Sequence, residues 1–178
     1  MPRQIVLLRG INIGSRNRIA MGELGEVLTN AGFADVRTYL QSGNVVLTSD
    51  RKLDDVVGTV KRVIEDELGL DIAVIGRTRA QLAKVVEANP LRRIAKNPKL
   101  HQVSFLAARP NRDLIRRLEE AAAPSERVVA SGREIYAWHP DGAARSKLWA
   151  LLAGERLGIT ATSRNWTTVT KLLALADE

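Results

Sequence analysis

Two groups of polar residues have the types and spacing expected of a site that holds an anion. The first group is Arg9, Gly10, Asn12 and Gly14, followed by Ser42, Gly43 and Asn44. The second group is Arg145, Ser146 and Lys147, followed by Thr162, Arg164, Asn165 and Trp166. Arginine offers two parallel donors to a phosphate or carboxylate, and glycine lets the backbone approach a ligand closely. Both groups therefore predict binding of a small anionic ligand.

Neither group contains a recognised catalytic site. A nucleophile with its base is missing from both, and Gly10-x-x-x-Gly14 lacks the Lys-Ser or Lys-Thr that completes a phosphate loop. Any catalysis would have to work by electrostatic stabilisation, with Arg9, Arg164 and Lys147 as charge clamps. The sequence therefore assigns no reaction, and an enzyme remains one alternative beside a binding protein.

A purely structural role is the other interpretation of the same residues. Glycine and asparagine are common in tight turns for backbone reasons alone. Ser146 fits the first position of a helix as a cap, and Trp166 fits a core anchor beneath a terminal helix.

The polar residues must be positioned by a repeated series of strands and helices, which the hydrophobic periodicity indicates. In the first half, strands are expected over 4–8, 36–40, 45–48 and 71–75, and helices over 21–31 and 53–68. In the second half, strands are expected over 103–107, 127–130, 134–138 and 159–163, and helices over 111–122, 146–157 and 168–176. Thr78 and Gln81 predict a capping box for a connecting helix that runs to about residue 88.

Each half reads β-α-β-β-α-β, which predicts an α+β fold of two tandem ferredoxin-like units packed together, with a connecting helix and a C-terminal helix. The expected domains are 1–76, a connecting helix and basic linker over 77–100, and a second unit with the terminal helix over 101–178. In this topology the first and third strands are antiparallel neighbours. Arg9 should therefore lie beside Asn44. The fourth strand of the second half should end at the edge where the second helix begins, which would place Arg164 near Lys147.

The net charge of +7 is concentrated in residues 77–117, which carry eleven Lys or Arg and two acidic residues. Such a stretch favours polyanionic partners, although charged runs also serve solubility alone. An alternative function is binding of single-stranded nucleic acid, with Phe105, Tyr136 and Trp138 as stacking residues on the second sheet. A third alternative is self-association through a sheet edge or the leucine-rich terminal helix. The oligomeric state is not predicted.

Several kinds of site and location are disfavoured by composition. The chain has no cysteine, and its two histidines, His101 and His139, are far apart in sequence, so neither a metal site nor a cofactor is expected. No apolar run approaches the roughly 18 to 20 residues of a membrane span, and the chain opens on a strand pattern rather than a signal peptide. We therefore expect a cytoplasmic protein without a membrane partner.

Four segments of the chain resemble the signature of a known family. They are residues 7–14 and 38–46, which contain the first polar group, and residues 145–148 and 162–169, which contain the second. Together they are similar to the domain-of-unknown-function family 1697. The resemblance implies a bacterial protein with two related α+β halves and no established activity. Ser15 stands where this family usually has a second glycine, and Thr167 where it often has asparagine.

Overall fold

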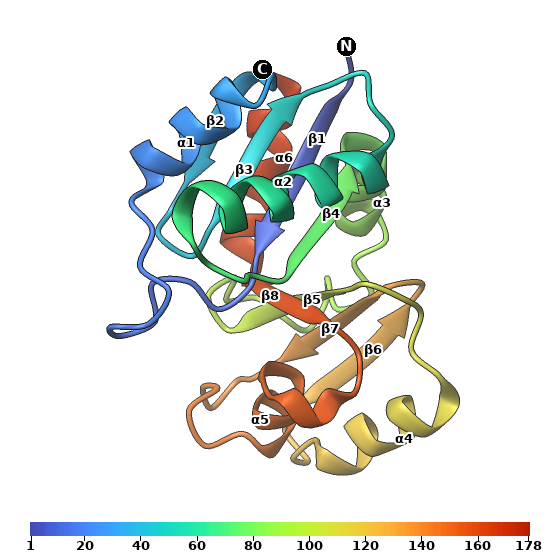
Figure 1. Ribbon diagram of the computed structural model, residues 1–178. Coiled ribbons are helices and arrows are strands. Elements are labelled where there is room, and N and C mark those ends of the chain that lie inside the picture. Colours follow the sequence, from blue (N-terminus) through green and yellow to red (C-terminus); the bar gives the residue numbers. More distant parts are fainter. The chain divides into compact units, whose positions relative to one another are not determined.

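The computed structural model describes residues 1–178 and contains two four-stranded antiparallel sheets (Figure 1). Each sheet is formed by a β-α-β-β-α-β segment, which confirms the predicted α+β fold of two tandem ferredoxin-like units. The chain divides into two compact units, one of Met1–Lys84 with Leu172–Glu178 and one of Val85–Lys171. The domain boundaries expected at residues 76 and 101 stay predictions.

The first unit follows the predicted order of elements. In chain order they are β1 (Arg3–Leu8), α1 (Met21–Asn30), β2 (Ala34–Tyr39), β3 (Asn44–Thr48), α2 (Leu53–Leu68) and β4 (Val74–Thr78). The strands lie in the order β2-β3-β1-β4. Helices α1 and α2 cover one face of this sheet, where their apolar side chains form a core with Val6, Leu8 and Val45.

Helix α2 shows why the local sequence was sufficient to predict this unit's helices. Its residues Val56, Val60 and Ile64 recur four positions apart, and all three are buried. The helix ends at Gly69, which adopts the left-handed conformation with φ of 68°. The apolar stripe therefore faces the sheet.

The register between β1 and β3 brings two distant segments together. Leu7 pairs with Asn44 across these antiparallel strands, and the Leu8 N–H donates to the Gly43 carbonyl oxygen at 2.9 Å. The segment that begins at Arg9 therefore lies beside Ser42, Gly43 and Asn44, as the topology predicted.

The second unit repeats the architecture. After α3 (Arg79–Glu87), the elements are β5 (His101–Leu106), α4 (Arg112–Ala121), β6 (Arg127–Ser131), β7 (Glu134–Trp138), α5 (Lys147–Ala153), a 3-10 turn η1 (Glu155–Leu157), β8 (Ala161–Asn165) and α6 (Trp166–Asp177). The strand order is β6-β7-β5-β8. Leu114 and Leu118 of α4 and Leu148 and Leu152 of α5 form a core against one face of the sheet.

The predicted capping box at α3 is present. The Thr78 N–H donates to Gln81 Oε1 at 2.9 Å, and the Gln81 N–H donates to Thr78 Oγ1 at 3.1 Å. These reciprocal bonds satisfy backbone donors that the first turn of the helix leaves without partners. The side chain of Arg79, the first residue of α3, pairs with Asp177 of α6 at 2.7 Å.

Most elements begin and end within two residues of the predicted boundaries, and two elements differ by more. Strand β4 covers residues 74–78 instead of 71–75, and its Gly76 lies where α2 comes close, because an added Cβ would be 2.5 Å from Val57 Cγ2. Helix α5 ends at Ala153 instead of residue 157, since Gly154 leaves the helical conformation with ψ of 172°. None of the chain's helices combines the length and apolar character needed to cross a membrane.

Candidate functional site

The β1–α1 loop, residues 9–20, is held in one conformation by Asn12. The Asn12 Nδ2 group donates to the Ile19 carbonyl at 2.9 Å, while its Oδ1 accepts from the Ile19 N–H at 2.8 Å. The same Nδ2 donates to the Gln41 carbonyl in the β2–β3 turn at 2.7 Å. Asn12 therefore joins the two loops of the first polar group through its side-chain hydrogen bonds.

Asn44 and Gly43 shape the β2–β3 turn, residues 40–43. Asn44 is buried, and its Nδ2 donates to the Tyr39 carbonyl at 2.7 Å and to Ser42 Oγ at 3.0 Å. Gly43 has φ of 88°, and a Cβ added there would lie 2.7 Å from Ile11 Cδ1. The amide of Asn44 and the glycine both serve the turn, in line with the structural interpretation of these two residues.

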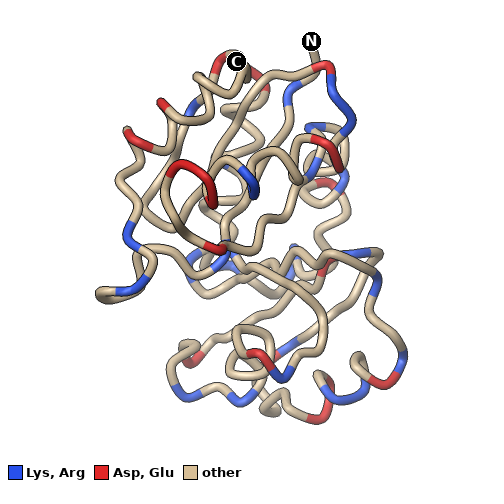
Figure 2. Tube along the Cα trace, in the orientation of Figure 1, with Lys and Arg blue, Asp and Glu red and all other residues tan.

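Positive charge gathers on the β1–α1 loop without balancing acids. Arg16 and Arg18 are exposed, neither takes part in an ion pair, and Arg18 Nη1 donates to the Gly14 carbonyl at 3.0 Å. Residues 1–22 contain no Asp or Glu, and Figure 2 shows blue but no red along this loop. Arg9 and Gly10 are partly buried at its start, and Gly14 is exposed at its tip. This loop is the best candidate for an anion site within either unit.

The second polar group contains two helix caps. Ser146 Oγ accepts from the Trp149 N–H at 3.0 Å at the start of α5, and Asn165 Oδ1 accepts from the Thr168 N–H at 2.9 Å at the start of α6. Arg145 and Lys147 flank Ser146 and are exposed. The capping role expected for Ser146 is confirmed.

Arg164 lies on the opposite face of the second sheet from α5. Ser163 Oγ is 2.6 Å from Ser104 Oγ on the face that carries the α4–α5 core, and side chains alternate along a strand. Arg164 and Thr162 therefore share the other face, where Arg164 Nη1 donates to Thr162 Oγ1 at 2.7 Å. Arg164 is buried, and burial lowers the pKa of its guanidinium to about 10. The structure does not bring Arg164 and Thr162 to the side of the sheet where Ser146 and Lys147 lie.

Trp166 stacks on His101. Their ring centroids are 4.7 Å apart with an interplanar angle of 8°, and the backbone N–H of Trp166 donates to the Pro98 carbonyl at 3.1 Å. His101 is buried, which together with the nearby His139 lowers its pKa to about 4. The tryptophan therefore contacts β5 at the start of α6 but is only half-buried, so the expected role as a core anchor is not confirmed.

The sequence analysis missed a buried polar cluster formed by Glu126, His139 and Ser146. His139 Nδ1 lies 2.5 Å from Glu126 Oε2, and Ser146 Oγ donates to the same oxygen at 2.6 Å. Burial alone would raise the pKa of Glu126, but hydrogen bonds from Ser146, the Ala123 N–H and His139 outweigh it, and the pKa is lowered. The spacing of these residues in the sequence does not predict the cluster, because Glu126 and His139 come together only when β6 pairs with β7.

This cluster is not arranged as a nucleophile with its base. Ser146 Oγ donates to the carboxylate and lies 3.4 Å from His139 Nδ1, the nitrogen that already faces Glu126. An activated serine instead donates its proton to a basic imidazole nitrogen. The geometry supports a role in positioning the loop between β7 and α5.

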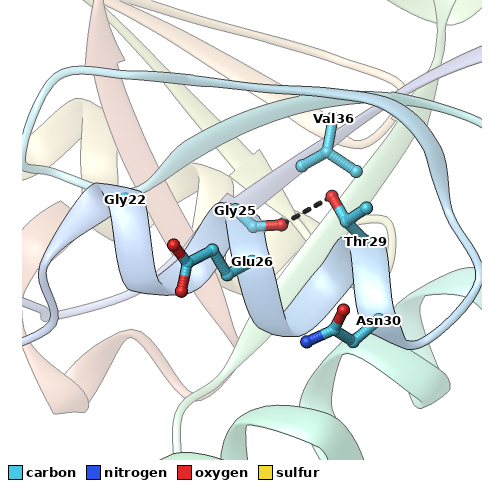
Figure 3. Close-up of a pocket in the computed structure, with 6 residues that line it drawn as sticks. All are labelled: Gly22, Gly25, Glu26, Thr29, Asn30 and Val36. Carbon is cyan, nitrogen blue, oxygen red and sulfur yellow. Dashed lines mark hydrogen bonds between the residues drawn. The ribbon is translucent and has the colours of Figure 1, made fainter.

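Two hollows of the surface are lined by residues outside the first polar group. One, of about 400 Å³, is lined by residues of α1 and by Val36, with Glu26 as its single charged side chain (Figure 3). The other, of about 660 Å³, is lined by Lys147, Ala150, Leu151, Gly154, Glu155 and Arg156. The carboxylate of Glu26 makes the first unsuited to an anion. No group of three or more His, Cys, Asp or Glu side chains is placed to hold a metal ion.

The rings suggested for stacking on nucleic acid are largely inaccessible. Phe105 and Tyr136 are buried, and Tyr136 Oη donates to the Val85 carbonyl at 2.9 Å. Burial, with a smaller effect of Glu134, raises the pKa of Tyr136 to about 12. Because stacking requires an exposed ring face, these two residues cannot serve the nucleic-acid function as folded.

Comparison with known proteins agrees with the architecture. A structure described as conserved bacterial protein SP0830 from Streptococcus pneumoniae matches with a TM-score of 0.80 and 21% sequence identity, over 98% of each chain. This similarity shows a shared fold. No curated protein matches the chain. Residues 1–136, which include the first polar group, match the family described as "Protein of unknown function (DUF1697)". The chain belongs to this DUF1697 family.

Proposed function

We propose that the protein binds a small anionic ligand, bearing a phosphate or carboxylate, at the β1–α1 loop and the β2–β3 turn. The observation that carries the proposal is the exposure of Arg16 and Arg18 on a loop held by internal hydrogen bonds, with no carboxylate in ion-pairing contact. Two guanidinium groups of this kind attract an oxyanion and can bind it through charge-assisted hydrogen bonds.

Bracing of the loop strengthens the proposal. The Asn12 bonds to Ile19 and Gln41 and the Asn17 Nδ2 bond to the Gly10 carbonyl at 3.1 Å hold the loop before any ligand arrives. A preorganised loop loses less conformational entropy on binding. Asn12 and Asn44 therefore shape the site in this proposal, and Arg16 and Arg18, which the predicted site did not include, join Arg9 and Ser42 as candidate ligand contacts.

The second polar group supports a separate binding site less well. Arg164 and Lys147 would have to act together, yet they belong to opposite sides of their sheet, and α5 is too short to present a strong N-terminal dipole. We therefore restrict the proposal to the first group.

A titration of the full chain with inorganic phosphate, followed by amide chemical shifts, tests the proposal. We expect saturable shifts confined to residues 9–20 and 40–43, with a dissociation constant on the order of 1 mM for so exposed a site. The double variant Arg16→Gln and Arg18→Gln should weaken binding at least about tenfold, because charge-assisted bonds dominate it. Exposed Arg62 on α2 supplies a matched control, and Arg62→Gln should leave binding unchanged.

A control titration with sodium chloride at equal ionic strength distinguishes specific phosphate binding from general charge screening. Shifts that fail to saturate, or that chloride reproduces in the same residues, would show that the loop is only a charged turn.

A further inference from the structure

Exposed aliphatic side chains occur on both loops of the proposed anion site. The chain's large exposed hydrophobic residues are Met1, Ile13, Leu40 and Ile94, with 75%, 69%, 52% and 47% of their surface accessible. Ile13 and Leu40 are the chain neighbours of Asn12 and Gln41, which are joined by the 2.7 Å hydrogen bond between the loops. Two of these four residues therefore lie at one place on the first unit.

Leu40 is held there in an unfavourable backbone conformation. Its φ is 58°, in the left-handed region that glycine and asparagine adopt readily and leucine does not. A glycine or asparagine would satisfy the β2–β3 turn with less strain. Strained and exposed residues of this kind are a reason to look for an interaction surface.

Ile13 stands on a small hairpin of its own. The Arg16 N–H donates to the Ile13 carbonyl at 3.2 Å, and Ile13 and Arg16 form an isolated antiparallel bridge. The loop extends away from the sheet of the first unit in Figure 1. Ile13 is thus presented on a short, braced projection next to Arg16 and Arg18.

We propose that these two loops dock on an anionic phospholipid surface, with Ile13 and Leu40 entering the interfacial region and Arg16 and Arg18 contacting lipid phosphates. This inference rests on the proposed anion site and identifies its anion as a lipid headgroup. A chain without a spanning helix can still bind a bilayer peripherally when apolar side chains and cations act together. This inference departs from the expectation of no membrane partner, which came from the lack of a spanning apolar run and from the strand pattern at the start of the chain.

The chemistry of the surface fits an anionic bilayer. Two exposed aliphatic side chains beside two exposed arginines match a bilayer interface, where apolar groups enter just below a layer of lipid phosphates. No Asp or Glu lies within residues 1–22 or 36–49 to repel the anionic lipid.

Co-sedimentation of the full chain with lipid vesicles provides the test. The chain should bind vesicles of phosphatidylcholine mixed with phosphatidylserine, reversibly and with a partition coefficient on the order of 10⁴ M⁻¹, and should bind pure phosphatidylcholine at least about tenfold less. Replacing both arginines, by Arg16→Gln and Arg18→Gln, should reduce binding roughly 25-fold, since each basic residue near the surface contributes about fivefold.

The apolar contribution has its own matched variants. Ile13→Ser together with Leu40→Asn should reduce vesicle binding about tenfold or more while leaving the phosphate titration unchanged, because lost apolar burial affects only the bilayer. Asparagine tolerates the backbone conformation at residue 40, so the variant should remain folded by circular dichroism. Ile94→Ser, at an exposed isoleucine in the second unit, should leave vesicle binding unchanged.

Each outcome decides between the two proposals. Phosphate binding without vesicle binding, or vesicle binding that the Ile13 and Leu40 changes leave intact, overturns the lipid inference and keeps the anion site. Binding of polyglutamate in place of vesicles overturns it in favour of an acidic protein. Failure of both phosphate and vesicles to bind removes both proposals.

Discussion

Asn12, Asn44 and Gly43 show how single residues fix the backbone of the two loops that form the candidate anion site. Asn12 satisfies backbone groups on two loops, and the amide of Asn44 is bonded to the turn around it. Gly43 occupies a left-handed position with no room for a methyl group. The arginines of the candidate site therefore lie on a backbone that hydrogen bonds within the protein already hold in place.

Gly43→Ala should destabilise the protein by roughly 2–4 kcal/mol, from the left-handed conformation and the clash with Ile11 and Leu8 combined. The same change at Gly22 of α1, where an added Cβ meets nothing within 4 Å, should stabilise it by about 0.5–1 kcal/mol, since alanine favours helices. Urea unfolding measures both. Equal effects of the two substitutions would show that the turn relaxes around a side chain.

At the scale of elements, the start of α5 depends on a carboxylate from another element. Ser146 caps the helix and donates to Glu126, which also binds His139 at the end of β7. The cluster thus joins the β6 start, the β7 end and the α5 cap. Helix α4 has a simpler start, where Asn111 Oδ1 accepts from the Leu114 N–H at 2.8 Å.

Ser146→Ala should cost about 2–3 kcal/mol, because it removes a cap and leaves a buried carboxylate without one of its donors. Asn111→Ala removes only a cap and should cost about 1 kcal/mol. Comparing the free energies of unfolding of the two variants measures the contribution of Glu126. Equal costs would mean that the carboxylate finds another donor and that the cluster does not position the helix.

At the scale of the whole molecule, the buried histidine links stability to pH. Burial, and then repulsion from His139, lowers the pKa of His101 from 6.5 to about 4. Between these values the unfolded chain binds a proton at His101 that the folded chain does not. Stability from this residue is therefore fully present above pH 6.5 and is lost as the pH falls toward 4.

We expect the free energy of unfolding to fall by about 2–3 kcal/mol between pH 7 and pH 4 through His101 alone, since one pKa unit corresponds to about 1.4 kcal/mol. Urea unfolding at a series of pH values measures this change. The lowered pKa of Glu126 acts in the same direction but below its ordinary value of 4.5, so the range above pH 4.5 isolates the histidine effect.

His101→Gln should flatten the pH profile above pH 4.5, whatever it does to stability at pH 7. A variant profile parallel to that of the original protein would assign the acid sensitivity to other groups.

Short-range chemistry explains which parts of this molecule were predictable. The spacing of Val56, Val60 and Ile64, the capping box at Thr78 and Gln81, and Gly69 after its helix all act within a few residues of chain. Once the order of elements was known, antiparallel pairing placed Arg9 beside Asn44. For this reason the fold class, and the meeting of the two segments of the first polar group, followed from the amino-acid sequence.

Only the tertiary structure determined on which face of a sheet each side chain lies and which distant elements are in contact. Arg164 faces away from α5 because the pairing of β8 with β5 sets which side chains alternate onto the helix-covered side. Glu126 and His139 meet only through the β6–β7 hairpin, and Gly76 of β4 lies where α2 leaves no room for a side chain. The sequence by itself determined the elements and their order, because these arise from local periodicity. Which side chains meet was decided by register and packing, which act between segments that the sequence keeps apart.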